Sequence, residues 1–335
     1  MSGNRAWIDV HYHAMNDPFR DALSSIGGII RTPDWSRQKA LEFSERRDIG
    51  TGILSLGVPG AHLGDDAKAR DLARRCNEDL ANFIALHPRR FGQFAITPMP
   101  DIDGACEAAA FALDELKADG IILLSSYDGQ SLGQPQWDPL LDVLNERNAV
   151  CFIHPNNPPA AAVARQGFSQ GIGNFLGEFV FDTSRAGLNL LFNDCLDRYP
   201  NIKFILAHAG GTLPYFSWRL GEIMQRQMTN DPWDKQYRSR FMDANAGKVT
   251  RDLVLSKIRR FYFDTALSAG PQAIASLLQV ADHDKILFGS DWPYCPEDMA
   301  VSMIDALEGN PLLDEKMKGA IARGNAVKLF PRLAG

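Results

Sequence analysis

Short, mostly apolar runs recur along the chain and alternate with segments whose apolar residues are three or four positions apart. Eight of these runs, each seven to nine residues long, span residues 6–13, 51–57, 91–99, 119–127, 149–155, 202–210, 260–267 and 285–293. Runs of this length without strict alternation are typical of parallel strands that are buried on both faces. The pattern therefore predicts eight buried strands separated by helices.

Two of the intervening segments carry a clear helical spacing. The first should end before Pro88, because proline breaks a helix, and its apolar face comprises Leu72, Cys76, Leu80, Phe83 and Ile84. The second should begin at an N-cap formed by Thr183 or Ser184 and end before Pro200. Its apolar face comprises Leu188, Leu191, Phe192, Cys195 and Leu196.

Strands that alternate with helices define an α/β protein, and eight such units predict a (β/α)8 TIM barrel that occupies residues 1–335 as one domain. A doubly wound open sheet is the alternative, although no GxGxxG sequence follows the first run. The longest irregular segments should be loop insertions at the C-terminal face of the barrel, and they span residues 14–35, 156–182 and 225–248.

The composition narrows the choice of partners and of cellular compartment. The formal net charge is −6, the pI is about 5.7 and no basic block is present, so a nucleic-acid partner is not expected. The apolar runs are too short to span a membrane, and residues 1–5 do not resemble a signal peptide. Five scattered cysteines without a CxxC pair indicate reduced thiols and a cytoplasmic protein.

Histidine side chains collect at the ends of the predicted strands. His11 and His13 are two positions apart on the first strand, so both side chains point to the same side. His154 ends the fifth strand, His208 the sixth and Asp291 the eighth. Closing the barrel would bring these residues to its C-terminal mouth. Imidazole and carboxylate groups in this number suit one divalent transition metal with a spare acid/base group.

These motifs resemble the amidohydrolase superfamily and, within it, the metal-dependent decarboxylase branch. That branch includes the aminocarboxymuconate-semialdehyde, γ-resorcylate and 6-methylsalicylate decarboxylases. The matching segments cover nearly the whole chain and are residues 8–13, 152–155, 204–211, 287–293 and 324–330. The 6-methylsalicylate group is the most similar of the three, through residues 52–60, 123–129 and 181–186.

Two features separate the chain from other members of the superfamily. The γ-resorcylate group begins with a Glu-x-His pair, where this chain has His11 and His13. Hydrolytic members often bind two metal ions through a carboxylated lysine on the fourth strand, and residues 124–127 contain no lysine. The resemblance therefore implies one divalent ion held by His11, His13, His154 and Asp291. Zn²⁺ is expected, with Mn²⁺ as the alternative.

The resemblance also implies a carboxy-lyase that acts without oxidation on a small ortho-hydroxylated aromatic acid or a conjugated unsaturated acid. His208 and Asp291 are the expected catalytic residues, and the sequence leaves open which of them delivers the proton. A metal-dependent hydrolase of an ester, lactone or amide is the alternative, because the same ligands can activate water. A non-catalytic metal-binding barrel is a second alternative, although it would not need an acid/base group.

Two further residues are expected to contact the carboxylate substrate. In the decarboxylase branch an arginine at the position of Arg219 enters the neighbouring subunit's site and clamps the substrate carboxylate, which implies a homodimer. An ordinary exposed arginine is the alternative. Trp292 would form an aromatic wall of the pocket or belong to the core. The remaining histidines do not end strands and are expected to be non-catalytic: His62, His87 and His283.

Overall fold

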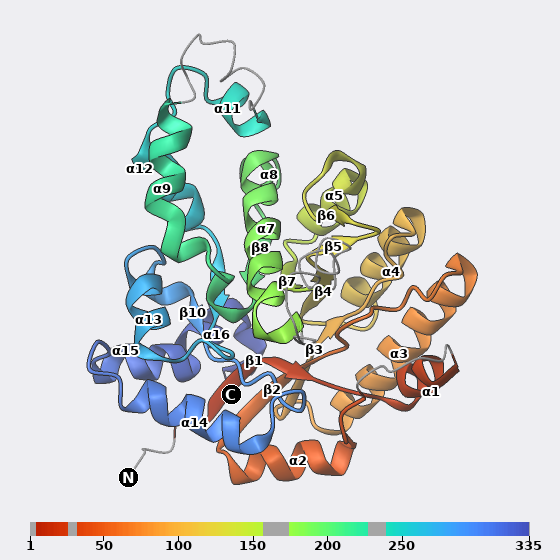
Figure 1. Ribbon diagram of the computed structural model, residues 1–335. Helices are drawn as coiled ribbons and strands as arrows, with labels where there is room; N and C mark the ends of the chain where they lie inside the picture. The colour runs from red at the N-terminus through yellow and green to blue at the C-terminus, as the bar shows by residue number, and fades with distance from the viewer. Residues whose placement is uncertain (1–4, 26–31, 157–173, 227–238, 335) are drawn as a thin grey trace, which may run out of the picture.

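The structure is a computed structural model that describes residues 5–25, 32–156, 174–226 and 239–334. Within these residues, eight parallel strands form one sheet that curves into a barrel with helices around its outside (Figure 1). In sheet order the strands are β1 (Trp7–His13), β2 (Ile49–Ser55), β3 (Phe91–Ala95), β4 (Gly120–Leu124), β7 (Val150–His154), β8 (Lys203–Leu206), β9 (Tyr262–Asp264) and β10 (Ile286–Leu287). Each strand overlaps one predicted run, although β2 begins two residues before its run, and the predicted TIM barrel is confirmed.

The barrel closes where β1 meets the chain that follows β10. The amide of Asp291 donates to the carbonyl of His11 at 2.8 Å. The amide of His13 donates to the carbonyl of Trp292 at 2.7 Å. These bonds continue the pairing beyond the two-residue strand β10, so the first and last strand segments are held together at the C-terminal mouth.

Helices follow the strands along the chain and cover the barrel (Figure 1). The longer ones are α1 (Asp17–Ser25), α2 (Arg37–Arg46), α3 (Asp66–Leu86), α4 (Ile102–Asp114), α5 (Asp138–Glu146), α7 (Glu178–Phe192), α9 (Leu213–Arg226), α12 (Arg251–Ile258), α13 (Pro271–Leu278) and α14 (Glu297–Glu308). The shorter ones are α8 (Cys195–Arg198), α11 (Arg240–Ala244), α15 (Glu315–Gly319) and α16 (Asn325–Leu329). α3 carries the first predicted helical face and ends before Pro88, as expected.

The prediction that Thr183 or Ser184 caps the second helix is wrong. α7 begins at Glu178, both side chains are buried within it, and α8 follows as a separate helix. The Ser184 hydroxyl donates to the carbonyl of Val180 at 2.7 Å and accepts from the amide of Thr212 at 2.8 Å. Ser184 therefore satisfies an amide at the start of α9, a helix that follows α7 only after β8.

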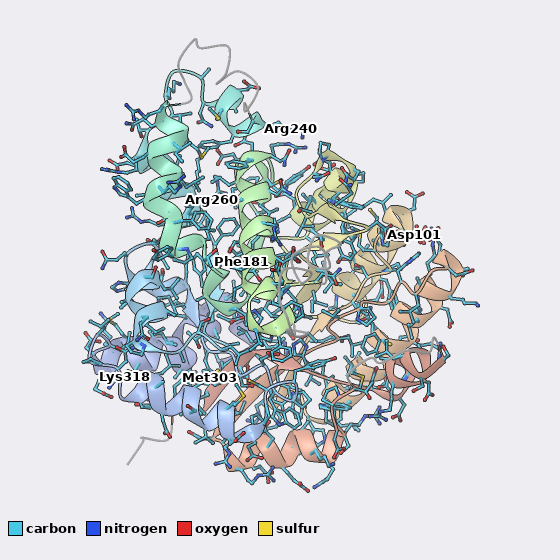
Figure 2. The ribbon with its side chains drawn as sticks, in the orientation of Figure 1. Asp101, Phe181, Arg240, Arg260, Met303 and Lys318 are labelled. Carbon is cyan, nitrogen blue, oxygen red and sulfur yellow. The ribbon has the colours of Figure 1, made fainter. Side chains whose placement is uncertain are left out.

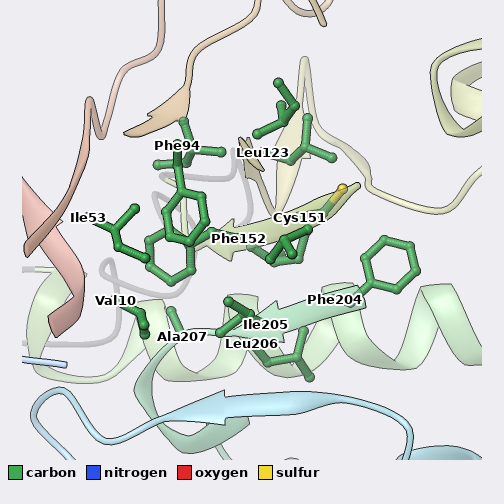
Figure 3. Close-up of a cluster of buried hydrophobic side chains, with 14 of the residues drawn as sticks. Val10, Ile53, Phe94, Leu123, Cys151, Phe152, Phe204, Ile205, Leu206 and Ala207 are labelled. Atoms are coloured by element: carbon green, nitrogen blue, oxygen red, sulfur yellow. The ribbon is translucent and has the colours of Figure 1, made fainter. Parts of the chain in front are cut away.

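Aromatic side chains fill the barrel beneath its C-terminal mouth. Phe94 of β3 and Phe152 of β7 lie with ring centroids 5.3 Å apart and an interplanar angle of 25° (Figure 3). Phe152 also meets the ring of His11 edge to face, at 4.9 Å between centroids. Because alternate residues of β7 point the same way, Phe152 lies below His154 on the inside of the barrel. Phe94 and Phe152 thus form an apolar layer beneath the histidines, which we call the aromatic floor.

Parts of the three predicted insertions lie outside the described residues, namely 26–31, 157–173 and 227–238. The described parts include α1 in the first insertion and α11 in the third. α9, α12 and α11 project together from the barrel (Figure 1). Arg240 lies at the start of α11 (Figure 2). Its guanidinium nitrogen Nη1 is 3.3 Å from Oδ2 of Asp138 in α5, and this ion pair connects the projection to a neighbouring helix. In the part of the chain that the structure describes, no helix is long and apolar enough to cross a membrane.

Candidate metal centre

Three histidines and one aspartate converge at the C-terminal mouth of the barrel. His11 and His13 come from β1, His154 from the end of β7 and Asp291 from the chain after β10, and one ligand atom of each lies within 4.8 Å of the others. Nε2 of His11 is 3.1 Å from Nε2 of His13. Oδ1 of Asp291 is 3.3 Å from the first of these nitrogens and 3.1 Å from the second. The three histidines are buried and the side chain of Asp291 is 12% exposed. The structure thus brings the four expected metal ligands together.

The backbone around β1 fixes where Asp291 stands. Asp291 has a positive φ of 57°, and its amide is held by the carbonyl of His11. Gly289 allows this close approach, because a Cβ at that position would lie 2.7 Å from the Cβ of His11. A side chain at position 289 would therefore force the chain after β10 away from β1 and displace Asp291 from the histidines.

His208 stands beside the four ligands rather than among them. Its Nε2 lies 3.8 Å from Oδ2 of Asp291, and its ring centroid lies 5.0 Å from that of His11. Nδ1 of His208 is buried and has no hydrogen-bond partner among the described residues. Buried polar atoms are normally hydrogen-bonded, so this nitrogen is a natural contact for a bound molecule.

A left-handed turn positions His208. It is the first of four consecutive residues with positive φ, which end at Gly211. Only glycine fits at the last position, because a Cβ there would lie 1.9 Å from the carbonyl oxygen of Val180. The turn carries the chain from β8 directly into α9 and leaves the His208 ring against His11.

Hydrogen bonds to the outer ring nitrogens orient two of the ligands. Nδ1 of His11 lies 2.9 Å from Oδ2 of Asp264, and Nδ1 of His154 lies 2.8 Å from the carbonyl oxygen of Pro155. Both partners are acceptors, so in the neutral ring each Nδ1 carries the proton and each Nε2 keeps its lone pair. His13 has a weaker partner, the Ser55 hydroxyl at 3.3 Å. This arrangement leaves imidazole lone pairs available to one ion.

Asp264 is the residue near the site that the strand-end pattern missed most clearly. It is fully buried on β9, and while Oδ2 meets His11, Oδ1 accepts from the amides of His208 at 3.0 Å and Ala266 at 2.9 Å. The available signal was an aspartate inside the apolar run 260–267, near the end of a predicted strand. An acidic residue there is costly unless it has several partners.

Asp9 is a second buried carboxylate that the strand-end pattern did not single out. Its Oδ1 accepts from the amides of His11 at 3.0 Å and Ser290 at 3.1 Å. Burial raises the pKa of Asp9 to about 7, although the hydrogen bonds from Ser290 oppose the rise. Asp9 thereby fastens β1 to the segment that carries Asp291.

The electrostatics of the ligand set suit a cation. Burial lowers the pKa of His13 and holds the pKa of His154 well below its usual range, so both rings are neutral. Burial also disfavours a charge on His11, but the carboxylates of Asp264 and Asp291 outweigh it and raise the pKa of His11 to about 10. Burial alone would raise the pKa of Asp291, whereas the His11 ring holds it well below its usual range. With a pKa of about 10, the His11 ring carries a proton on both nitrogens while no ion is bound, and it would release the Nε2 proton on binding one. The neutral rings of His13 and His154 and the ionised carboxylate are donors that fit a divalent transition metal.

Arg219 does not reach the cluster of its own chain. It is exposed on α9, and it has no hydrogen-bond or ion-pair partner among the described residues. Exposed apolar side chains share that helix, with Tyr215 at 84% exposure, Trp218 at 62% and Ile223 at 40%. These positions recur at helical spacing, so they form one exposed face with Arg219.

Trp292 is not brought to the metal ligands. Its ring stacks on Phe43 of α2 at 4.6 Å and 10°, and it also meets Tyr12, which points to the outside of β1. In the segment after β10, the aromatic ring that meets a ligand is that of Tyr294, 5.0 Å from the ring of His13 and nearly perpendicular to it. Trp292 is therefore a core residue between β1 and α2. Tyr294, just past the predicted strand end, supplies an aromatic ring beside the ligand His13.

The other histidines make contacts away from the cluster. His62 lies 2.8 Å from the carboxylate of Asp66, and His87 packs its ring on Phe83 at 5.2 Å. His283 belongs to a short turn before β10. None of the three is among the residues that could hold the ion in the described chain.

Comparisons with known proteins relate the whole chain to metal-dependent enzymes. The sequence model of the amidohydrolase family matches residues 8–332. The chain is 34% identical to the 6-methylsalicylic acid decarboxylase of Penicillium expansum, over 98% of both chains. It is also 34% identical to a 6-methylsalicylic acid decarboxylase of Aspergillus aculeatus, over 97% of this chain and 96% of that one. The crystal structure of a dihydroxybenzoic acid decarboxylase from Polaromonas sp., with manganese and the inhibitor 2-nitroresorcinol bound, is similar with a TM-score of 0.78 and 25% identity, over 97% of this chain and 96% of that one.

We predict that His11→Ala and His154→Ala each give a folded protein that retains little metal and has no turnover. Each change removes one of the four expected ligands, and the two remaining histidines and Asp291 should hold the ion more weakly. Elemental analysis after dialysis measures the metal content, with His62→Ala as the matched histidine control. Full metal occupancy in either cluster variant would contradict the ligand assignment.

Proposed function

The chain belongs to the amidohydrolase family, and from that premise we propose that it is a metal-dependent, non-oxidative decarboxylase of a small ortho-hydroxylated aromatic acid of the 6-methylsalicylate kind. A conjugated unsaturated acid is the second substrate class that the same chemistry accepts. The observation that carries the proposal is the buried cluster of His11, His13, His154 and Asp291, with His208 beside it, in a chain similar over its whole length to such decarboxylases.

The reaction needs a proton at the carbon that carries the carboxylate. Loss of CO2 from an aromatic ring is slow, because the departing electron pair has no vacant orbital to enter. If that carbon is protonated first, the pair released from the carbon–carboxylate bond can return to the ring and restore its aromaticity. The sum is replacement of the carboxylate by the added proton, and the acid group of the protein then regains a proton from solvent.

One divalent ion is proposed, held by His11, His13, His154 and Asp291. When bound, it supplies positive charge that orients the substrate carboxylate and ortho hydroxyl and lowers the pKa of that hydroxyl. A set of three imidazoles and one carboxylate suits Zn²⁺, while the manganese in the Polaromonas relative supports Mn²⁺ as the alternative. No lysine is present in β4, which supports one ion rather than two.

The proton transfer is assigned to the pair His208 and Asp291. Their side chains are 3.8 Å apart at the closest nitrogen and oxygen, and Nδ1 of His208 is buried without a partner among the described residues. His208 can therefore bind or move a proton next to the ion without being one of its ligands. The aromatic floor of Phe152 and the ring of Tyr294 limit access of water to the same space.

Product analysis tests the reaction class. Protein loaded with Zn²⁺ or Mn²⁺ is incubated with salicylates, resorcylates and muconate semialdehydes, and the CO2 in the headspace is measured with the phenolic product. From salicylates and resorcylates we expect equal amounts of CO2 and phenol, and from a muconate semialdehyde equal amounts of CO2 and the decarboxylated aldehyde. In heavy water each product should carry one deuterium at the carbon that bore the carboxylate. Release of a new carboxylate from an ester, lactone or amide, with no CO2 from any acid, would identify a hydrolase instead.

We predict that Asp291→Asn and His208→Ala each lower kcat by at least about a hundredfold, because both remove a group that exchanges protons at the ion. Steady-state rates are measured at saturating substrate, and metal content is measured in parallel so that loss of the ion is separated from loss of the proton route. Near-wild-type kcat in either fully loaded variant would assign that residue a structural role only.

The proposal includes a homodimer in which Arg219 serves the site of the other subunit. Arg219 is exposed and makes no hydrogen bond or ion pair with the described cluster of its own chain, and exposed large apolar side chains lie near it on α9. Monomeric proteins rarely leave such a patch uncovered, which supports a second copy of the chain as its cover. An arginine delivered in this way would also explain how a protein of net charge −6 binds an anionic substrate. A cytoplasmic location is proposed as well, supported by five cysteines that are all free thiols.

We predict that Arg219→Ala raises KM for carboxylate substrates, with a loss of about 2–4 kcal/mol expected from removal of a buried charge-assisted pair. Mixing this variant with inactive Asp291→Asn protein should restore part of the activity, because one hybrid site then has both residues intact. Arg75→Ala, an exposed arginine on α3, is the matched control. Absence of recovery after verified subunit exchange would rule out the shared site.

A further inference from the structure

A single buried carboxylate connects the metal ligand His11 to the acid/base residue His208. Asp264 is 0% exposed, and its two oxygens have different partners. Oδ2 lies 2.9 Å from Nδ1 of His11, and Oδ1 accepts from the backbone amide of His208 at 3.0 Å. Oδ1 also accepts from the amide of Ala266 at 2.9 Å, which holds the carboxylate itself in place.

We propose that Asp264 is a positioning residue that fixes which nitrogen His11 turns toward the ion and where the turn bearing His208 begins. The inference rests on the proposed metal site, but it does not depend on the reaction being a decarboxylation. It assigns to β9, which contributes no metal ligand, the role of aligning residues from β1 and from the end of β8.

Asp264 fixes the position of the proton on the His11 ring. A carboxylate accepts and never donates, so in the neutral ring that can bind an ion the proton must be on Nδ1, which leaves the lone pair of Nε2 for the ion. The ring has no room to adopt another orientation, because the rings of Phe152, His13 and His208 lie within 5.0 Å of it, centroid to centroid. The proton position is therefore the remaining variable, and Asp264 determines it.

Asp264 also holds the backbone of His208. This residue has a φ of 54°, a left-handed conformation that costs free energy for a residue with a side chain. Its amide lies beyond the paired part of β8 and would be buried without a partner if Asp264 were absent. The bond to Asp264 satisfies that amide and stabilises the conformation from which the His208 ring meets His11.

An amide side chain cannot do both tasks. Asparagine at position 264 offers one acceptor oxygen and one NH2 group in place of two acceptor oxygens. If the oxygen accepts from the amides of His208 and Ala266, the NH2 group faces Nδ1 of His11. Nδ1 must then accept, and the ring proton moves to Nε2, where the ion needs a lone pair. Asp264→Asn should therefore weaken metal binding although it hardly changes the size of the side chain.

Asp182 provides a matched control for the loss of a buried carboxylate. It is 1% exposed on α7, and it accepts from the Ser125 hydroxyl and from the amide of Asn156 at 3.0 Å. It lies near the same end of the barrel, and none of its hydrogen bonds goes to an imidazole of the cluster. Asn156 belongs to the peptide whose carbonyl accepts from Nδ1 of His154, and an amide oxygen at position 182 can still accept from Asn156. Asp182→Asn thus introduces the same chemical change while His154 keeps its acceptor.

The experiment measures metal affinity without any substrate. Wild-type, Asp264→Asn and Asp182→Asn proteins are stripped of metal and titrated with Zn²⁺ against a chromophoric chelator, and circular dichroism checks their folds. We expect the Kd for Zn²⁺ to rise about 10- to 100-fold in Asp264→Asn, the usual effect of losing such a partner, and to stay within about threefold of wild type in Asp182→Asn. The Co²⁺-substituted proteins give a second readout, because the visible spectrum should change only for Asp264→Asn.

The outcomes separate this inference from the proposals on which it rests. Wild-type affinity and an unchanged Co²⁺ spectrum in Asp264→Asn would overturn the role of Asp264 and leave the metal site standing. Failure of the wild-type protein to bind Zn²⁺, Mn²⁺ or Co²⁺ would overturn both. If Asp264→Asn does not fold, Asp264→Glu keeps both acceptor oxygens, and we expect it to bind Zn²⁺ with a Kd closer to wild type than Asp264→Ala. Equal affinity of the Glu and Ala variants would contradict the need for an acceptor.

Discussion

The hydrogen bond from the amide of Asp291 to the carbonyl of His11 joins the first strand of the barrel to the segment that follows its last strand. The rest of the site depends on this closure, because it brings the aspartate beside two histidines that lie nearly the whole chain length away. Gly289 permits the close approach of the two segments. Asp9 reinforces it, because its carboxylate accepts hydrogen bonds from the amides of His11 in β1 and of Ser290 after β10. The ligand set is therefore a direct product of barrel closure.

A buried polar group lowers the stability of the fold unless it has a hydrogen-bond or ion-pair partner. The structure provides such partners on the outer side of the ligand rings and on their inner side. The imidazoles of His11 and His154 donate outward to acceptors and present their second nitrogen inward. Oδ1 of Asp291 faces Nε2 of His11 and Nε2 of His13, and the aromatic floor formed by Phe152 and Phe94 lies beneath the cluster. A positive ion is the natural complement of lone pairs and a carboxylate held together in an apolar enclosure.

The acid/base residue is placed by different means from the ligands. His208 follows β8 in a left-handed turn that requires glycine at its end, and the turn leads at once into α9. α9 in turn carries Arg219 and the exposed apolar side chains to which we assign the second subunit. One short segment of chain thus connects the proposed proton route to the proposed dimer contact, which is why both are expected to respond to changes at the β8–α9 junction.

The sequence alone determined the eight strands, the shared direction of His11 and His13, and the membership of His154 and Asp291 in one cluster. These features follow from local periodicity and from the rule that parallel strands end on the same side. The tertiary structure alone decided the roles of Asp264 and Ser184, since their partners are distant in the chain: Asp264 and His11 are 253 residues apart, and Ser184 serves a helix other than its own. It also decided that Trp292 belongs to the core while Tyr294 faces the cluster, because the direction of a side chain after a strand end depends on turn geometry that no periodicity encodes.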